Sequence, residues 1–83
     1  MTLNQYNLMD QATQAHILSD YGVLLADRHD IGHVILLYQI DGFYVEVYYS
    51  RQSIKLVRFR SFSNTDELSP YLGRIDIEEL INT

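Results

Sequence analysis

Two apolar-rich runs separated by only Asp41 and Gly42 constrain the fold of this chain more than any other feature. The runs cover residues 33–40 and 43–49 and are rich in β-branched and aromatic side chains. Both central positions of a type I′ turn require positive φ, which an Asp-Gly pair adopts readily, so such a pair between two strand-like runs is the strongest short-range hairpin signal. The sequence therefore predicts an antiparallel hairpin at this point.

Two further strand-like runs flank this hairpin. Residues 23–28 precede it across the polar turn 29–32, and residues 54–62 follow it after the short connection 50–53. Short connections join antiparallel neighbours, because parallel strands need a long crossover. The chain is therefore expected to form a four-stranded antiparallel β-meander.

One helix is expected before the sheet, somewhere between Asn4 and Tyr21, because this stretch is rich in good helix formers. Gly22 stands where a left-handed C-cap would end it. The helix is expected to pack one broad apolar face on the sheet: Leu8, Ala12, Ala15 and Leu18. Two residue pairs are candidate start signals: Thr2 with Gln5, and Asn7 with Asp10.

Two short helical candidates follow the sheet. Ser69 and Pro70 resemble an N-cap followed by proline at the first helical position. Asp76 and Glu79 resemble a capping box. The predicted fold is thus a single α+β domain over residues 1–83, in which an N-terminal helix packs on a four-stranded antiparallel β-meander and a short helical tail follows.

The composition and charge exclude several classes of function. The chain has 83 residues and no cysteine, which excludes disulfide scaffolding, thiolate catalysis and cysteine-ligated zinc. A net charge of −5 disfavours nucleic acids and anionic membranes as partners. The first ten residues lack a signal-peptide pattern and no apolar run is long enough to span a membrane, so we expect a cytoplasmic protein.

The hairpin register divides the sheet into two faces. With Ile40 opposite Phe43, one face becomes an ordinary apolar core. For the next pair of strands we predict the register that keeps arginines out of that core, with Glu46 opposite Arg58 and Tyr44 opposite Arg60. This choice pairs Val47 with Val57 and Val45 with Phe59.

The other face is the candidate binding surface. It mixes apolar, aromatic and charged side chains: Ile35, Leu37, Tyr44, Glu46, Tyr48, Leu56, Arg58 and Arg60. A solvated sheet face normally alternates cleanly between apolar and polar residues, so something is expected to cover part of this one. Two coverings remain open: the C-terminal tail, through residues such as Leu68 and Tyr71, or a protein partner, most simply a second copy of the chain.

No set of residues forms a recognisable catalytic or metal-binding motif. Histidines and carboxylates cluster at residues 27–33, but the spacing matches no metal motif. Glu46 lies among tyrosines and arginines, an arrangement that resembles an acid/base site. No nucleophile or second carboxylate accompanies it, however. We therefore predict no catalytic residues, no metal and no cofactor.

Several segments together resemble a group of small, functionally uncharacterised bacterial proteins of similar length. The segments are 43–49 (FYVEVYY), 58–62 (RFRSF), 70–72 (PYL) and 75–77 (IDI), and the likeness covers roughly residues 6–81. The resemblance implies a helix, a β-meander and an "IDI…EL" tail, together with a bacterial source. It implies no activity and no functional residues.

Two functions remain open from the sequence. The first is a non-enzymatic protein-interaction or assembly domain that self-associates as a homodimer, or binds another protein, through the second sheet face or a strand edge. The alternative is a small-molecule-binding or catalytic domain with a groove around Glu46, Tyr44, Tyr48, Arg58 and Arg60.

Overall fold

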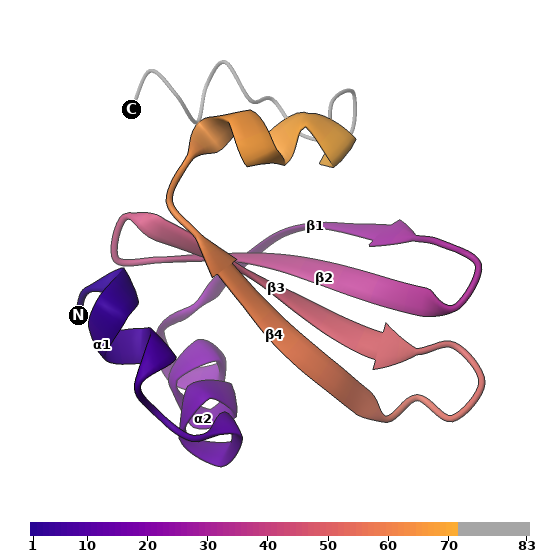
Figure 1. The fold of residues 1–83 in the computed structure, drawn as a ribbon, viewed down its shortest axis with the longest axis horizontal. Helices are drawn as coiled ribbons and strands as arrows, with labels where there is room; N and C mark the ends of the chain where they lie inside the picture. Colours follow the sequence, from indigo (N-terminus) through magenta and orange to yellow (C-terminus); the bar gives the residue numbers. More distant parts are fainter. Residues whose placement is uncertain (72–83) are drawn as a thin grey trace.

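A single antiparallel sheet with the strand order β1-β2-β3-β4 forms the centre of the molecule (Figure 1). The computed structural model describes residues 1–71. Its elements are α1 (Leu3–Asn7), α2 (Gln11–Tyr21), β1 (Val23–His29), β2 (His33–Ile40), β3 (Phe43–Ser50), β4 (Leu56–Phe62) and the 3₁₀ helix η1 (Thr65–Tyr71). This arrangement confirms the predicted α+β class. No helix within residues 1–71 has the length and apolar character needed to cross a membrane.

The N-terminal region contains two helices where one was predicted. Thr2 caps α1 through a complete capping box with Gln5, and the Asp10 side chain caps α2 by accepting a hydrogen bond from the Thr13 amide. The first start signal is therefore correct. In the second, Asn7 is the last residue of α1 and Asp10 is itself the N-cap of α2, so the chain breaks between the two helices at residues 8–10. An N-cap residue has extended backbone angles, so Asp10 interrupts the helix that it then restarts.

This break also changes which side chains reach the core. Leu8, which was predicted to face the sheet, is 88% exposed, while Tyr6 is fully buried. Leu18 is buried as predicted. Gly22 is extended rather than left-handed, so the predicted C-cap conformation is wrong. A Cβ atom at Gly22 would lie 2.7 Å from the Leu18 carbonyl oxygen, so close approach to the helix explains the glycine.

The central hairpin forms as predicted. Asp41 and Gly42 have φ values of 47° and 84°, the positive angles that the turn requires. Ile40 pairs with Phe43, and the register continues in step along both strands.

The predicted register between β3 and β4 is wrong by two residues. Glu46 pairs with Arg60 and not with Arg58. A shift of two residues leaves Arg58 and Arg60 on the same face, outside the helix-side core. An irregularity between Tyr48 and Tyr49, which leaves one extra residue in β4, moves Leu56: it pairs with Tyr49 and packs in the helix-side core instead of on the second face.

The sheet separates two apolar clusters. The helices α1 and α2 and the 3₁₀ helix η1 lie on opposite sides of it (Figure 1). The face that α1 and α2 contact, here called the helix side, holds a core around Tyr6, Leu18, Phe43, Val45 and Val47. The opposite face, called the η1 side, holds a second cluster of buried residues: Leu37, Tyr44, Phe62, Leu68 and Tyr71. Leu68 and Tyr71 thus confirm that the tail covers this face.

Other expectations for the tail turn out differently. Ser69 and Pro70 do not start a helix, because both lie within η1 and Pro70 is inside it. The 3₁₀ helix begins earlier, at Thr65, where the Asn64 side chain accepts a hydrogen bond from the Asp66 amide. The capping box predicted at Asp76 and Glu79 lies outside the described residues.

Candidate functional site

Glu46 lies at the centre of the η1 side, and its carboxylate is almost completely buried at 2% side-chain exposure. The middle of β3 places it there, and three other elements supply its partners. Arg60 of β4 donates a 2.8 Å hydrogen bond to Oε1, and Arg28 of β1 donates a 3.2 Å hydrogen bond to Oε2. The Tyr71 hydroxyl of η1 donates to Oε2 at 2.6 Å. The site therefore joins β1, β3, β4 and η1 through one carboxylate.

A second tier of contacts holds these donors in place. The Tyr48 hydroxyl lies 3.4 Å from Glu46 Oε1 and accepts a 3.3 Å hydrogen bond from Arg28. Arg60 also pairs with Glu67 of η1. The Arg28 guanidinium lies 5.5 Å from the centre of the Tyr71 ring, within the range of a cation–π contact.

The protonation of the site follows from these contacts. Burial by itself would raise the pKa of Glu46, but hydrogen bonds from Tyr71, Arg60 and Arg28 outweigh it and lower that pKa below its usual value. Burial and the hydrogen bond to Glu46 both raise the pKa of the Tyr71 hydroxyl. At neutral pH the site therefore holds an ionised carboxylate and a protonated phenol.

This arrangement suits a structural anchor better than an acid/base catalyst. A general base needs a pKa near the working pH and a free lone pair aimed at the substrate. Glu46 has a lowered pKa, and four described side chains surround its two oxygens. The carboxylate connects η1 to three strands of the sheet.

Most of the predicted site residues do lie together on the η1 side, but largely out of reach of a partner. Ile35 and Leu37 are fully buried, and Tyr44 and Tyr48 are 6% and 7% exposed. Tyr44 stacks on Phe62 at 5.5 Å between ring centres, in place of the predicted contact with Arg60.

The two remaining arginine predictions have different outcomes. Arg58 is exposed and lies over the Tyr48 ring at 4.3 Å, so it does not pair with Glu46 as the predicted register required. Arg60 does bond to Glu46. Leu56 is not part of the site, because it lies on the helix side.

Sequence reasoning missed two main partners of Glu46. The sequence placed Arg28 at the end of a strand but predicted no pairing between that strand and the next. In the structure Arg28 pairs with Ile35, which places it on the η1 side. The irregularity in β1 lies between Leu24 and Ala26, farther from the β1–β2 turn, and residues 26–29 pair in step, so counting back from the turn could have placed Arg28 on this side. Tyr71 belonged to one of the two coverings left open for this face, and its hydroxyl bond to Glu46 depends on how η1 docks.

The histidines and carboxylates at residues 27–33 form two separate pairs. His29 Nε2 lies 3.1 Å from Asp27 Oδ2, and His33 Nδ1 lies 3.1 Å from Asp30 Oδ1. Within residues 1–71 no group of three or more potential metal ligands comes together. Asp30 also accepts bonds from the Gly32 and His33 amides, which is the role of an aspartate in a tight turn.

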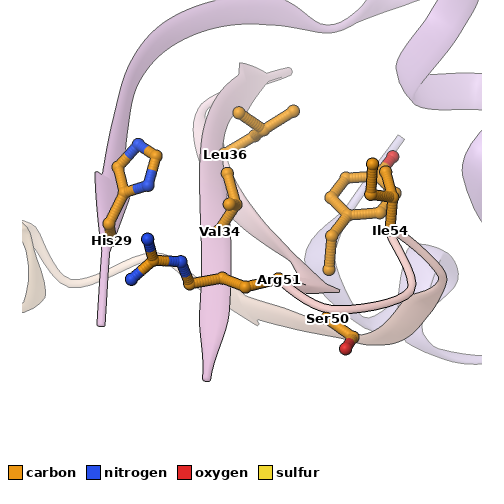
Figure 2. A pocket seen from close by; sticks show the side chains of 7 residues that line it. His29, Val34, Leu36, Ser50, Arg51 and Ile54 are labelled. Carbon is orange, nitrogen blue, oxygen red and sulfur yellow. The ribbon is translucent and has the colours of Figure 1, made fainter. Parts of the chain in front are cut away.

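The helix side contains a hollow that the sequence did not reveal. Its volume is about 420 Å³, and it is lined by His29, Val34, Leu36, Tyr49, Ser50, Arg51 and Ile54 (Figure 2). It lies near the β1–β2 and β3–β4 turns, beyond the residues that α2 covers. The connection carrying Arg51 and Ile54 was predicted to be a plain linker followed by a strand, so nothing in its sequence marked it as part of a cavity.

Comparisons with protein-family models, with curated proteins and with solved structures give no match. The functional argument therefore depends on the chain's own geometry.

Proposed function

We propose that this chain is a non-enzymatic protein-interaction domain that self-associates as a homodimer through the outer edge of β1. The observation that supports this most directly is the exposure of apolar side chains on that strand, with Val23 60% and Leu24 54% exposed. Within residues 1–71, β1 has a paired strand on one side only. An edge strand offers unpaired backbone groups that a second strand can bind.

The two edges of the sheet differ in how well they are protected. β1 contains neither proline nor lysine, the residues that commonly block edge pairing. The other edge strand, β4, carries charged residues and a register irregularity, as β1 also does, but α1 reaches β4 where Asn7 contacts Ser61. A covering helix prevents pairing, so the β1 edge, with Val23 and Leu24 exposed, is the better surface for a second copy.

The edge is also favoured over the second sheet face. The apolar side chains of that face are buried under η1 within one chain, so a partner would have to displace η1 to reach them. Antiparallel pairing of β1 with its copy needs no such displacement. It would continue the sheet across a two-fold axis, the commonest symmetry of homodimers.

Light scattering over a dilution series tests this proposal. We expect the natural chain to have twice the mass of one chain at high concentration and to dissociate on dilution. Leu24→Lys should give a single-chain mass throughout, because lysine on an edge strand opposes pairing. Val57→Lys is the matched control, since Val57 is 46% exposed on the opposite edge. A natural chain that is monomeric at every concentration would overturn the proposal.

One observation supports the alternative of a small-molecule-binding or catalytic domain. A hollow of about 360 Å³ opens between Arg28, Glu46, Tyr48, Arg60 and η1. Arg28 Nε is buried there and has no hydrogen-bond partner among the described residues, so it is a donor that a ligand oxygen could use. A thermal-shift screen with metabolites tests this alternative: a hit whose shift disappears in Glu46→Gln would support it, and the absence of any hit would count against it.

We also propose that the protein is bacterial and works in the cytoplasm without a cofactor. The absence of cysteine suits a reducing compartment. The bacterial source depends on the resemblance of the segments at residues 43–49, 58–62, 70–72 and 75–77 to small bacterial proteins.

A further inference from the structure

The helices leave one end of the helix side of the sheet uncovered. Figure 1 shows α1 and α2 gathered at the end of the sheet near the β2–β3 turn, while the β1–β2 and β3–β4 turns lie at the opposite end. The 420 Å³ hollow lies at this opposite end, over Val34 and Leu36 of β2 and Tyr49 of β3. Small-molecule sites commonly have volumes of roughly 300–1,000 Å³, so this hollow is large enough to be one.

The lining of the hollow is polar on one side and apolar on the other. Figure 2 shows Arg51 and His29 together at one side, Val34 and Leu36 in the middle, and Ile54 at the opposite side. Arg51 is the only permanently charged residue among the described residues of the lining, and no carboxylate lines the hollow. This distribution matches a ligand that has a negatively charged head and an apolar body.

Arg51 is held in place but retains free donors. Its backbone amide donates to the Gly32 carbonyl at 3.0 Å, and its Nη1 donates to the Asp30 carbonyl at 3.2 Å. These bonds tie the β3–β4 connection to the β1–β2 turn. A guanidinium has five N–H donors, and one of them makes the only side-chain bond seen for Arg51 within residues 1–71. The remaining donors are available to an anion.

The neighbouring histidine is fixed in a similar way. His29 Nε2 lies 3.1 Å from an Asp27 carboxylate oxygen, which leaves its other ring nitrogen for a ligand. Two aspartates lie in this part of the chain outside the lining of the hollow: Asp27 contacts His29, and Asp30 contacts His33.

Ile54 is unusual in both conformation and exposure. Its φ is 56°, in the left-handed region that β-branched residues avoid, and its side chain is 78% exposed. An asparagine or glycine would fit this backbone with less strain, and a polar residue would suit the exposure. Strained residues cluster at ligand-binding positions, where the interaction made there offsets the strain.

We propose that the hollow binds a small amphipathic carboxylate. The carboxylate head accepts hydrogen bonds from Arg51 and His29, and the hydrocarbon chain lies across Val34 and Leu36 against Ile54 and Tyr49. Apolar burial supplies most of the affinity, and the charged head sets the orientation and the selectivity for anions. This site is separate from the β1 edge and from the Glu46 cluster, so it goes beyond the interaction function proposed above.

A titration with sodium octanoate, followed by NMR of backbone amides and methyl groups, tests this site. We expect saturable shifts confined to the residues that line the hollow. 1-Octanol has the same chain length without the charge, and it should bind at least about tenfold more weakly, which corresponds to about 1.4 kcal/mol.

Two variants distinguish binding at this site from non-specific apolar binding. Arg51→Gln should weaken octanoate about tenfold and leave the affinity for 1-octanol unchanged, because only the anion uses the guanidinium. Arg58→Gln is the matched control: Arg58 is also exposed, but it lies over Tyr48 on the η1 side, so octanoate binding should not change.

Three results would overturn the proposal: no saturable shift at millimolar octanoate, shifts centred on the η1 side, or equal affinity for octanoate and 1-octanol. The same titration on Leu24→Lys should give the same affinity, since Leu24 lies opposite Tyr38 and does not line the hollow. A loss of binding in that variant would instead place the ligand at the dimer edge and overturn the site as described.

Discussion

The two faces of the sheet bury apolar surface in different ways. On the η1 side, seven residues of 3₁₀ helix cover the sheet, and a buried carboxylate ties them to β1, β3 and β4. On the helix side, two helices cover only one end, the core contains no ion pair among the described residues, and a hollow remains at the other end. The single 3₁₀ helix thus has the more specific anchor.

This difference shows what a buried charge contributes. A 3₁₀ helix of this length has too few hydrogen bonds to persist alone, so its position depends on docking. Apolar contacts through Leu68 would hold it near the sheet but would tolerate sliding. The directional bond from Tyr71 to Glu46 allows one position, which is the kind of specificity that a buried polar group can provide at some cost in stability.

Removing the Glu46 carboxylate should produce the largest effect. In Glu46→Ala the Arg28 guanidinium and the Tyr71 hydroxyl lose their shared acceptor inside the protein, so we expect the free energy of unfolding to fall by about 3 kcal/mol. Urea denaturation measures this loss. Glu67→Ala, which removes a carboxylate with 38% side-chain exposure from the same network, should cost less than about 1 kcal/mol. Equal losses would contradict the anchor role.

Removing one hydroxyl group from the anchor should have an intermediate effect. Tyr71→Phe keeps the ring in the η1-side cluster but deletes the 2.6 Å hydrogen bond to Glu46. Hydrogen bonds to charged groups contribute about 1.5–3 kcal/mol, and amide exchange in η1 should accelerate accordingly. Tyr21→Phe is the control, because Tyr21 is 72% exposed. Unchanged exchange in Tyr71→Phe would mean that packing alone positions η1.

Acid should weaken the η1 side more than the helix side. The pKa of Glu46 is lowered in the folded chain, so its contribution is present above the unfolded-state value of about 4.3 and is lost as pH falls through the folded value. We expect the free energy of unfolding to decrease below about pH 4, by less than in Glu46→Ala, since a protonated carboxyl still accepts hydrogen bonds.

The comparison with Glu46→Gln isolates this contribution. The amide cannot titrate, so the variant should start from a lower stability and show a shallower loss as pH falls below the unfolded-state pKa of a glutamate, about 4.3. Some slope should remain, because turn and cap hydrogen bonds also lower the pKa values of Asp10 and Asp30. Identical slopes in both chains would show that Glu46 titrates as an ordinary carboxyl.

The smallest expected effect concerns the uncovered end of the helix side, and it is an increase in stability. Ile54→Gly removes a β-branched side chain from a left-handed backbone, which should raise the free energy of unfolding by roughly 0.5–1 kcal/mol. Ile31→Gly is the control: Ile31 is fully exposed without a positive φ, so glycine should be neutral or slightly destabilising there. Destabilisation by Ile54→Gly would mean that the side chain packs locally.

Local signals in the sequence predicted the centre of the fold correctly. Asp41 and Gly42 determine a turn by their own backbone preferences, and a two-residue loop then leaves only one register for β2 and β3. The sequence also predicted that the apolar side chains of the second face need a cover. It left the tail and a protein partner open, and the structure shows the tail, through Leu68 and Tyr71.

The errors arose where one extra residue or one interruption changed the direction of side chains. The irregularity opposite Tyr48 moved Leu56 to the other face, although every residue type around it fitted the regular register. The break before Asp10 placed Tyr6 in the core and Leu8 in solvent. Bulges and helix breaks depend on the packing of the whole chain, so alternation alone cannot locate them.

For this protein, then, the sequence alone determined the hairpin, the order of the strands and the need to cover a second apolar face. These follow from backbone preferences and from the alternation of neighbouring residues, which are local properties. Only the tertiary structure decided that Arg28, Arg60 and Tyr71 meet at Glu46, and that Arg51 and Ile54 border a hollow. Those groupings join strands, turns and η1 across the sheet, and their distances depend on twist, register shifts and docking, none of which a local pattern contains.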